Sequence, residues 1–185
     1  MNIHQLSVTY DPLEDRVLLR VNTTTQEEVR VWLTRRMLTQ MLPHLPRVAS
    51  EQLALAAPVQ TALLTEQDKQ TFADIKQQEH LHKSDFSTPF QTGEKMLMDG
   101  DALLLTDLKM VPQTDGMTLI VLEERAREGR SARLMELRMK VELLHGLKHL
   151  LQEVWSQTGW TAPQVVGTAN PHMTLNAPPA GQLLN

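Results

Sequence analysis

Residues 16–34, RVLLRVNTTTQEEVRVWLT, decide the fold class. Hydrophobic and polar side chains alternate over residues 16–22 and again over residues 28–34, and the short polar run 23–27 joins them. A period of two is typical of strands with one buried face, and a short polar connection is typical of antiparallel neighbours. Residues 3–10 alternate more loosely. We therefore predict a three-stranded meander at the start of the chain.

A helix is predicted directly after this meander. Apolar residues between Met37 and Ala49 recur every three or four positions, which is the period of an amphipathic helix. Pro43 and Pro46 fall inside this pattern. Because each proline removes a backbone donor and crowds the preceding turn, we expect a kink or a break there.

The same order of elements recurs in the second half of the chain. Alternation over residues 102–111, 117–123 and 132–138 predicts further strands, and a leucine stripe over residues 140–157 predicts the clearest helix. Neither half can bury both its sheet and its helix stripe alone. We therefore predict an α+β fold of two similar antiparallel units that share one core, each with three or four strands followed by a long helix.

Composition divides the chain into four segments within one compact domain. Thr65 and Asp68 predict a capping box at the start of a strongly polar helix, residues 66–83, inside a helical and irregular connector. The last segment carries four prolines and little periodicity. The predicted segments are the first unit, 1–56, the connector, 57–101, the second unit, 102–160, and the Pro-rich tail, 161–185.

Composition and charge exclude several classes of protein. The 185 residues include no Cys, which excludes disulfides, thiolate metal sites and cysteine nucleophiles. The formal net charge is −4, so binding to nucleic acid would need a local basic patch. No run approaches the ~20 apolar residues of a membrane helix, and residues 1–10 lack the pattern of a signal peptide. We expect a cytoplasmic protein that does not bind membranes.

Arginine side chains gather with a tryptophan on one face of the first meander. Guanidinium groups beside an indole suit a single-stranded nucleic acid with stacked bases. Neighbouring acids allow a second interpretation, in which these arginines are solvent-facing strand residues paired with Glu14, Glu27 and Glu28. The candidate nucleic-acid-binding residues are Arg16, Arg20, Arg30, Trp32 and Arg36.

The order of a strand-rich segment and a long helix, found twice along the chain, resembles the Whirly and PUR families. The resemblance rests on topology over most of the chain. It implies that the two repeats pair and that their sheets bind single-stranded nucleic acid.

A short apolar hook interrupts the polar connector. Phe86, Pro89 and Phe90 lie within five residues of one another in a stretch that is otherwise polar. Aromatic side chains of this kind often dock on a protein surface. They are candidates for binding a partner, or for docking on the sheet of the same chain.

Two histidines have the spacing of a metal-binding pair. His145 and His149 are four residues apart on the predicted helix, and Glu142 falls on the same side. Such a pair can chelate a divalent ion, but a lone helical pair lacks further ligands. The three residues fall opposite the leucine stripe, so we expect them to be exposed. His80 and His82 of the polar helix could supply further ligands, but nothing in the sequence brings them together with this pair. We predict no metal site, with Glu142, His145 and His149 as weak candidates.

The sequence contains no recognisable catalytic motif. It lacks a phosphate loop, a glycine-rich dinucleotide turn and a serine elbow. We therefore predict a non-enzymatic binding or accessory protein without a cofactor, which acts through a protein partner or through self-association. A single-stranded nucleic-acid-binding protein is the alternative, and an enzyme of unrecognised class is the third interpretation.

Overall fold

The computed structural model describes residues 3–56, 65–129, 131–161 and 173–175, with the backbone alone for residues 66, 70 and 173–175. The first half comprises β1 (Ile3–Asp11), β2 (Arg16–Thr23), β3 (Glu27–Thr34), α1 (Arg35–Met41) and α2 (Leu45–Ala56). Next come α4 (Glu66–Lys83), β4 (Lys95–Met96), the short 3-10 helix η1 (Met98–Gly100) and β5 (Leu103–Leu104). The second half comprises β6 (Asp107–Pro112), β7 (Met117–Glu124), β8 (Arg133–Lys140), α5 (Val141–Gln157) and β9 (Met173–Leu175).

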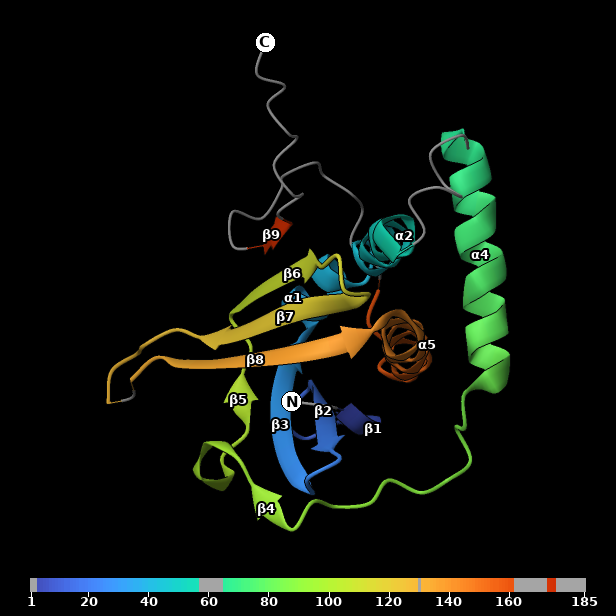
Figure 1. Ribbon diagram of the computed structural model, residues 1–185. Helices are drawn as coiled ribbons and strands as arrows, with labels where there is room; N and C mark the ends of the chain where they lie inside the picture. Colours follow the sequence, from blue (N-terminus) through green and yellow to red (C-terminus); the bar gives the residue numbers. More distant parts are fainter. Residues whose placement is uncertain (1–2, 57–64, 130, 162–172, 176–185) are drawn as a thin grey trace.

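The strands form two sheets, which confirms the predicted α+β class (Figure 1). The first sheet is the antiparallel meander β1-β2-β3, and the short strands β4 and β5 pair with β3 in parallel. The second sheet has the order β8-β7-β6-β9, in which β9 is parallel to β6. The predicted tail falls outside the described residues except for Thr161 and the backbone of β9.

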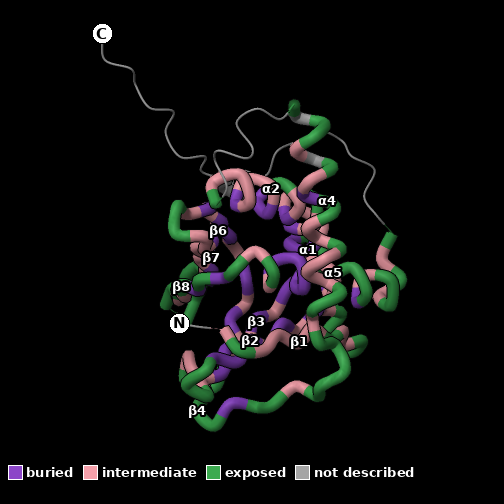
Figure 2. The backbone as a smooth tube through the Cα atoms, turned by 45° about the vertical axis from the view of Figure 1, so that its right-hand side comes forward, coloured by how far each residue is buried: buried purple, intermediate pink, exposed green. Residues whose placement is uncertain are grey.

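One hydrophobic core joins the two sheets and the helices α1, α2 and α5. The period of two places Val17, Leu19 and Val21 of β2 on the inner face, as predicted, and all three are buried. Figure 2 shows buried residues along the strands, whereas α4 alternates between exposed and half-buried residues. A small cavity of about 20 Å³ is lined only by apolar side chains, among them Leu33 of the first sheet, Ile120 of the second and Leu147 of α5.

The element order agrees with the prediction in both halves, but the equivalence of two units is not confirmed. Each three-stranded meander continues directly into a helix, α1 after β3 and α5 after β8. The helical parts differ, because the described residues of the first half form two helices, α1 and α2, and those of the second form one long helix, α5. The predicted break is confirmed, since α1 ends at Met41, before Pro43, and α2 begins at Leu45.

The polar helix α4 lies outside the core. Its predicted capping box is present, because the Thr65 hydroxyl accepts a bond from the Asp68 N–H and the Asp68 carboxylate accepts one from the Thr65 N–H. Ala73 is buried, but Ile75 is 58% exposed. α4 contacts α5 and α2 along one side, as Figure 1 shows. No helix within the described ranges is long and apolar enough to cross a membrane.

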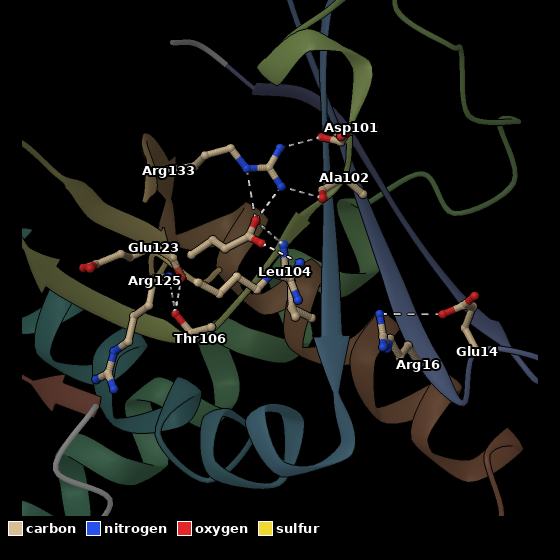
Figure 3. Close-up of polar contacts among 11 residues, drawn as sticks. Glu14, Arg16, Asp101, Ala102, Leu104, Thr106, Glu123, Arg125 and Arg133 are labelled. Atoms are coloured by element: carbon tan, nitrogen blue, oxygen red, sulfur yellow. Dashed lines mark hydrogen bonds and ion pairs between the residues drawn. The ribbon is translucent and has the colours of Figure 1, made fainter. Parts of the chain in front are cut away.

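Two buried carboxylates hold the chain that leads from α4 back to the second sheet. Glu28 of β3 accepts a bond of 2.9 Å from the Gly93 N–H. An added Cβ at Gly93 would lie 2.8 Å from the Gln26 carbonyl oxygen, so only glycine fits this close approach. Glu124 of β7 accepts a bond of 3.1 Å from the Leu104 N–H. It is also paired with Arg133, which donates to the carbonyl oxygens of Asp101 and Ala102 (Figure 3).

Candidate binding groove and the arginine face

An open groove of about 490 Å³ lies between β1, the segment that follows α4, and α5. We call it the edge groove. β1 contributes His4, Gln5 and Leu6, and the segment after α4 contributes Ser84, Asp85, Phe86, Thr88, Phe90 and Gln91. α5 contributes Glu142, Leu143, Gly146 and Leu150. The predicted hook therefore forms one wall of this groove through Phe86 and Phe90.

Local hydrogen bonds fix the course of the hook. The Asp85 carboxylate accepts bonds from the backbone N–H groups of Ser87 and Thr88, at 2.8 and 3.0 Å, and this folds the segment into a turn. The Gln5 side chain accepts a bond of 2.9 Å from the Gln91 N–H and donates one of 3.5 Å to the Pro89 carbonyl oxygen. The hook is thus attached to the outer face of the first sheet at β1.

The two aromatic side chains of the hook dock on different elements. The Phe86 ring packs on the His149 ring of α5, with centroids 4.9 Å apart, and remains 45% exposed. The Phe90 ring lies under the Arg20 guanidinium of β2, with 4.3 Å between the guanidinium carbon and the ring centroid. Such a cation–π contact contributes ~0.5–1 kcal/mol at an exposed site. The hook therefore docks on its own chain, and Phe86 also offers exposed ring surface to the groove.

Gly146 lies in the middle of α5 and lines the edge groove. An added Cβ at this position would meet no atom within 4 Å. A glycine inside a helix lowers the stability of the helix by ~1 kcal/mol relative to alanine. Such a glycine is often explained by a neighbour that packs too closely for a side chain. No described neighbour requires glycine here, so the missing side chain leaves the groove open.

The charged side chains that line the edge groove are acidic. Asp85 and Glu142 are the carboxylates, and the described lining includes no Lys or Arg. Hydrogen bonds from Thr88 and Ser87 hold the pKa of Asp85 well below its usual range, so this group is ionised at neutral pH. The Glu142 side chain is 52% exposed. An occupant with basic groups beside apolar side chains matches this lining.

The predicted nucleic-acid residues on the sheet are engaged with glutamates. Arg20 and Arg30 both donate to the buried carboxylate of Glu28, through Nε–Oε1 distances of 2.9 and 2.8 Å. Arg16 lies 3.6 Å from Glu14, as Figure 3 shows. These ion pairs agree with the second interpretation of the arginine face. Nucleic-acid binding itself stays a prediction.

Of the remaining residues of that prediction, Trp32 lies on the same face as this ion-pair cluster, two residues along β3 from Arg30, whereas Arg36 lies on α1. Trp32 is half-buried on β3, opposite Leu18 of β2 and Leu104 of β5. Arg36 is exposed on α1. The hook crosses one end of the face, because the Thr92 hydroxyl accepts a bond of 3.0 Å from Arg20 and the Gln91 carbonyl accepts one of 2.8 Å from Asn22.

Glu28 is ionised within this cluster. Burial alone would raise its pKa, but hydrogen bonds from Arg20, Arg30 and the Gly93 N–H outweigh burial and lower the pKa to about 2. Because its side chain is fully buried, this carboxylate depends on its partners for stability. The cluster therefore has a structural role in joining the hook segment to the first sheet.

The histidine prediction needs correction. His145 is 2% exposed, not solvent-facing, because α4 packs on that side of α5. Its Nδ1 lies 3.0 Å from Nδ1 of His80 in α4, and Nε2 of His80 lies 3.9 Å from a Glu142 oxygen. His149 instead lies against Phe86 and 3.6 Å from Glu153. Over the residues that the structure describes, no three metal-ligating side chains converge on one point.

Burial determines the protonation of His145. Burial, together with the smaller effects of nearby His80 and Lys148, lowers the pKa of His145 to about 4, whereas Glu142 acts in the opposite direction. The Lys148 ammonium donates a bond of 2.7 Å to Gln77 of α4. The contact between α4 and α5 is therefore polar and contains a neutral imidazole at pH 7.

The one serine hydroxyl in the described lining of the groove, Ser84, is not bonded to a base that could activate it. The Ser84 hydroxyl donates to the His80 carbonyl oxygen at 2.8 Å, which is a contact at the end of α4 and not a bond to an imidazole base. The enzyme interpretation stays a prediction.

Sequence reasoning missed most of the groove. It identified the hook, but not Gln5, Leu143 or Gly146. One signal could have indicated the α5 side of the groove, namely Gly146, a glycine in the middle of an otherwise strong predicted helix. Comparisons with protein-family models, with curated proteins and with solved structures find no match to this chain.

Proposed function

We propose that this chain is a non-enzymatic binding or accessory protein whose edge groove binds an extended segment of a protein partner. The observation that carries the proposal is the groove itself, about 490 Å³ in volume, which opens over a mid-helix glycine and is lined by Phe86, Phe90 and aliphatic side chains. Binding sites of this kind combine apolar walls with a few oriented polar groups.

The lining favours a segment in which apolar and basic residues alternate. The apolar walls suit Leu, Ile or Val, and the carboxylates of Asp85 and Glu142 suit Lys or Arg. β1 is an edge strand that pairs only with β2, and within the described part of the chain no backbone hydrogen bond uses its other edge. An extended segment could therefore add to this edge while its alternate side chains enter the groove.

Fluorescence anisotropy with synthetic peptides tests this proposal. The probe is a labelled peptide of about eight residues, the length of a typical strand, in which Leu and Lys alternate. Two matched peptides replace every Lys with Glu or with Ser. We expect micromolar binding of the Lys peptide, weaker binding of the Ser peptide and none of the Glu peptide. Equal binding of all three, or binding of none, contradicts the proposal.

A charge reversal locates the binding surface. Glu142→Lys should weaken binding of the Lys peptide about tenfold, because one attractive contact becomes repulsive. Glu153→Lys is the matched control, since Glu153 is exposed on the same helix but does not line the groove. An equal effect of both substitutions would mean that general charge, and not the groove, determines binding.

A labelled single-stranded oligonucleotide distinguishes the alternative function. We expect no binding that depends on salt at micromolar protein, because Arg20 and Arg30 are engaged by Glu28. Binding that weakens steeply with salt, without any binding of the peptides, would replace the protein-partner proposal with the nucleic-acid one.

A further inference from the structure

β8 is one of the two edge strands of the second sheet among the described residues, and β9 is the other. β8 pairs antiparallel with β7, from Arg133 opposite Glu124 to Lys140 opposite Met117. Among the described residues, no backbone hydrogen bond connects its other edge to a further strand. An edge strand of eight residues is long enough to pair with another chain.

The side chains of β8 alternate strictly. Leu137 and Met139 face the core and are buried, whereas Leu134, Glu136 and Arg138 point outward and are exposed. Leu134 is 55% exposed. Glu136 and Arg138 place opposite charges two residues apart on the same face.

This spacing is self-complementary. If two copies of β8 pair antiparallel about a two-fold axis at Leu137, each residue lies opposite the one at the same distance on the other side of the axis. Glu136 then faces Arg138 of the partner subunit, and Arg138 faces Glu136 of the partner subunit. Opposite charges directly across an antiparallel pair contribute ~0.2–1 kcal/mol each, and like charges destabilise.

We propose that β8 is a self-association edge, through which two copies of this chain form one continuous sheet across a two-fold axis. Charges on an edge strand can also serve to prevent pairing. A pair of opposite sign at this spacing attracts a second copy, whereas like charges at these two positions would repel it. The edge groove shares none of these residues, so the two proposals are independent.

An existing ion pair does not prevent the association. Arg138 is paired with Asp115 in the turn between β6 and β7, and both side chains are about half exposed. Exposed pairs of this kind contribute ~0–1 kcal/mol, so the exchange of one carboxylate for another costs little.

Sedimentation equilibrium with charge-swapped variants tests the proposal. We expect the wild-type chain at low salt to reach twice its mass of 21.0 kDa as its concentration rises. Arg138→Glu and Glu136→Arg should each weaken the dimer about tenfold, because each places like charges opposite one another. The double variant E136R/R138E should restore it, because the two charges merely exchange places.

A matched control separates this edge from general charge. Lys109→Glu makes the same change in net charge as Arg138→Glu, but Lys109 lies on β6 between β7 and β9, away from the edge. It should leave the dimer intact, and circular dichroism should show that every variant is folded. A monomer at all concentrations, or a dimer that the single and double variants affect alike, would overturn the proposal.

Discussion

The guanidinium of Arg20 lies 4.3 Å from the centre of the Phe90 ring, and the same group forms an ion pair with the buried carboxylate of Glu28. One side chain therefore connects the first sheet, the hook and the buried acid. Its position gives this arginine a structural role, because it holds one wall of the edge groove in place, and its predicted binding to nucleic acid stays a prediction.

Arg20→Ala should lower the free energy of unfolding by about 2 kcal/mol, because Glu28 stays buried and loses one of its two arginine partners. Urea unfolding measures this change. Arg16→Ala is the matched control, since Arg16 lies on the same strand and pairs with the exposed Glu14 at 3.6 Å. The control should cost less than about 0.5 kcal/mol. Equal costs would mean that the buried cluster adds nothing beyond surface charge.

His145 should make the stability depend on pH above the range in which carboxylates titrate. Its pKa in the folded state is about 4, below the ordinary value of 6.5, so the unfolded chain binds the proton first as pH falls. The resulting loss in the free energy of unfolding is absent well above pH 6.5 and grows as pH falls to about 4. Between pH 6.5 and pH 5 it amounts to about 2 kcal/mol.

Urea unfolding at several pH values checks this dependence. His145→Gln should remove most of the slope between pH 6.5 and pH 5. His44 also has a pKa lowered by burial and by Arg47, so His44→Gln serves as the comparison and should remove a smaller part. The carboxylate of Glu28 titrates below this window, because its pKa is about 2. A wild-type slope that His145→Gln leaves unchanged would contradict the buried neutral imidazole.

Gln52 should couple the two halves of the chain. It lies on α2, is 1% exposed, and exchanges two hydrogen bonds with the backbone of Gln113, at 3.0 and 3.1 Å. The Thr118 hydroxyl donates to it at 3.2 Å. Gln52→Leu removes the partner of the Gln113 carbonyl and of the Thr118 hydroxyl, whereas the Gln113 N–H keeps its bond of 2.8 Å to the Met117 carbonyl. We expect a loss of about 2 kcal/mol.

The control for Gln52 is Gln157→Leu at the exposed end of α5, which should cost less than about 0.5 kcal/mol. Tryptophan fluorescence and far-ultraviolet circular dichroism should report the same single transition for the wild-type chain, because one core joins both sheets. Two separate transitions would show that the halves unfold independently.

The α+β class and most of its elements could be predicted from the sequence because their signals are local. A period of two located β2, β3 and β7, a leucine stripe located α5, and Thr65 with Asp68 located the start of α4. The short strands β4 and β9 were not predicted, because each has two or three residues, too few for a period, and depends on a distant partner strand. The strand predicted over residues 102–111 is divided in the structure, because β5 pairs with β3 of the first sheet and β6 pairs with β7 of the second.

The groove could be predicted only in part, because its walls come from three distant parts of the chain. Phe86 and Phe90 were recognisable as apolar residues in a polar stretch. The exposure predicted for His145 was wrong, because no local pattern states which side of α5 a polar helix will cover. Gly146 was visible in the sequence only as a glycine within a helix. It could not be assigned to a groove, because the space beside it is formed by β1 and the hook.

Gly146→Leu tests the edge groove most directly. The added side chain should occupy the groove, because a Cβ at this position meets no atom within 4 Å. It should also raise the free energy of unfolding by up to ~1 kcal/mol, because leucine is a far better helix former than glycine. Lost binding therefore cannot be attributed to a damaged fold.

The measurement is anisotropy of the alternating Leu–Lys peptide with wild-type and Gly146→Leu protein, with thermal unfolding of both measured in parallel. We expect the variant to be at least as stable as the wild type and to bind the peptide at least tenfold more weakly. A variant that is equally stable and binds the peptide as tightly as the wild type would contradict the proposal that the groove is the binding site.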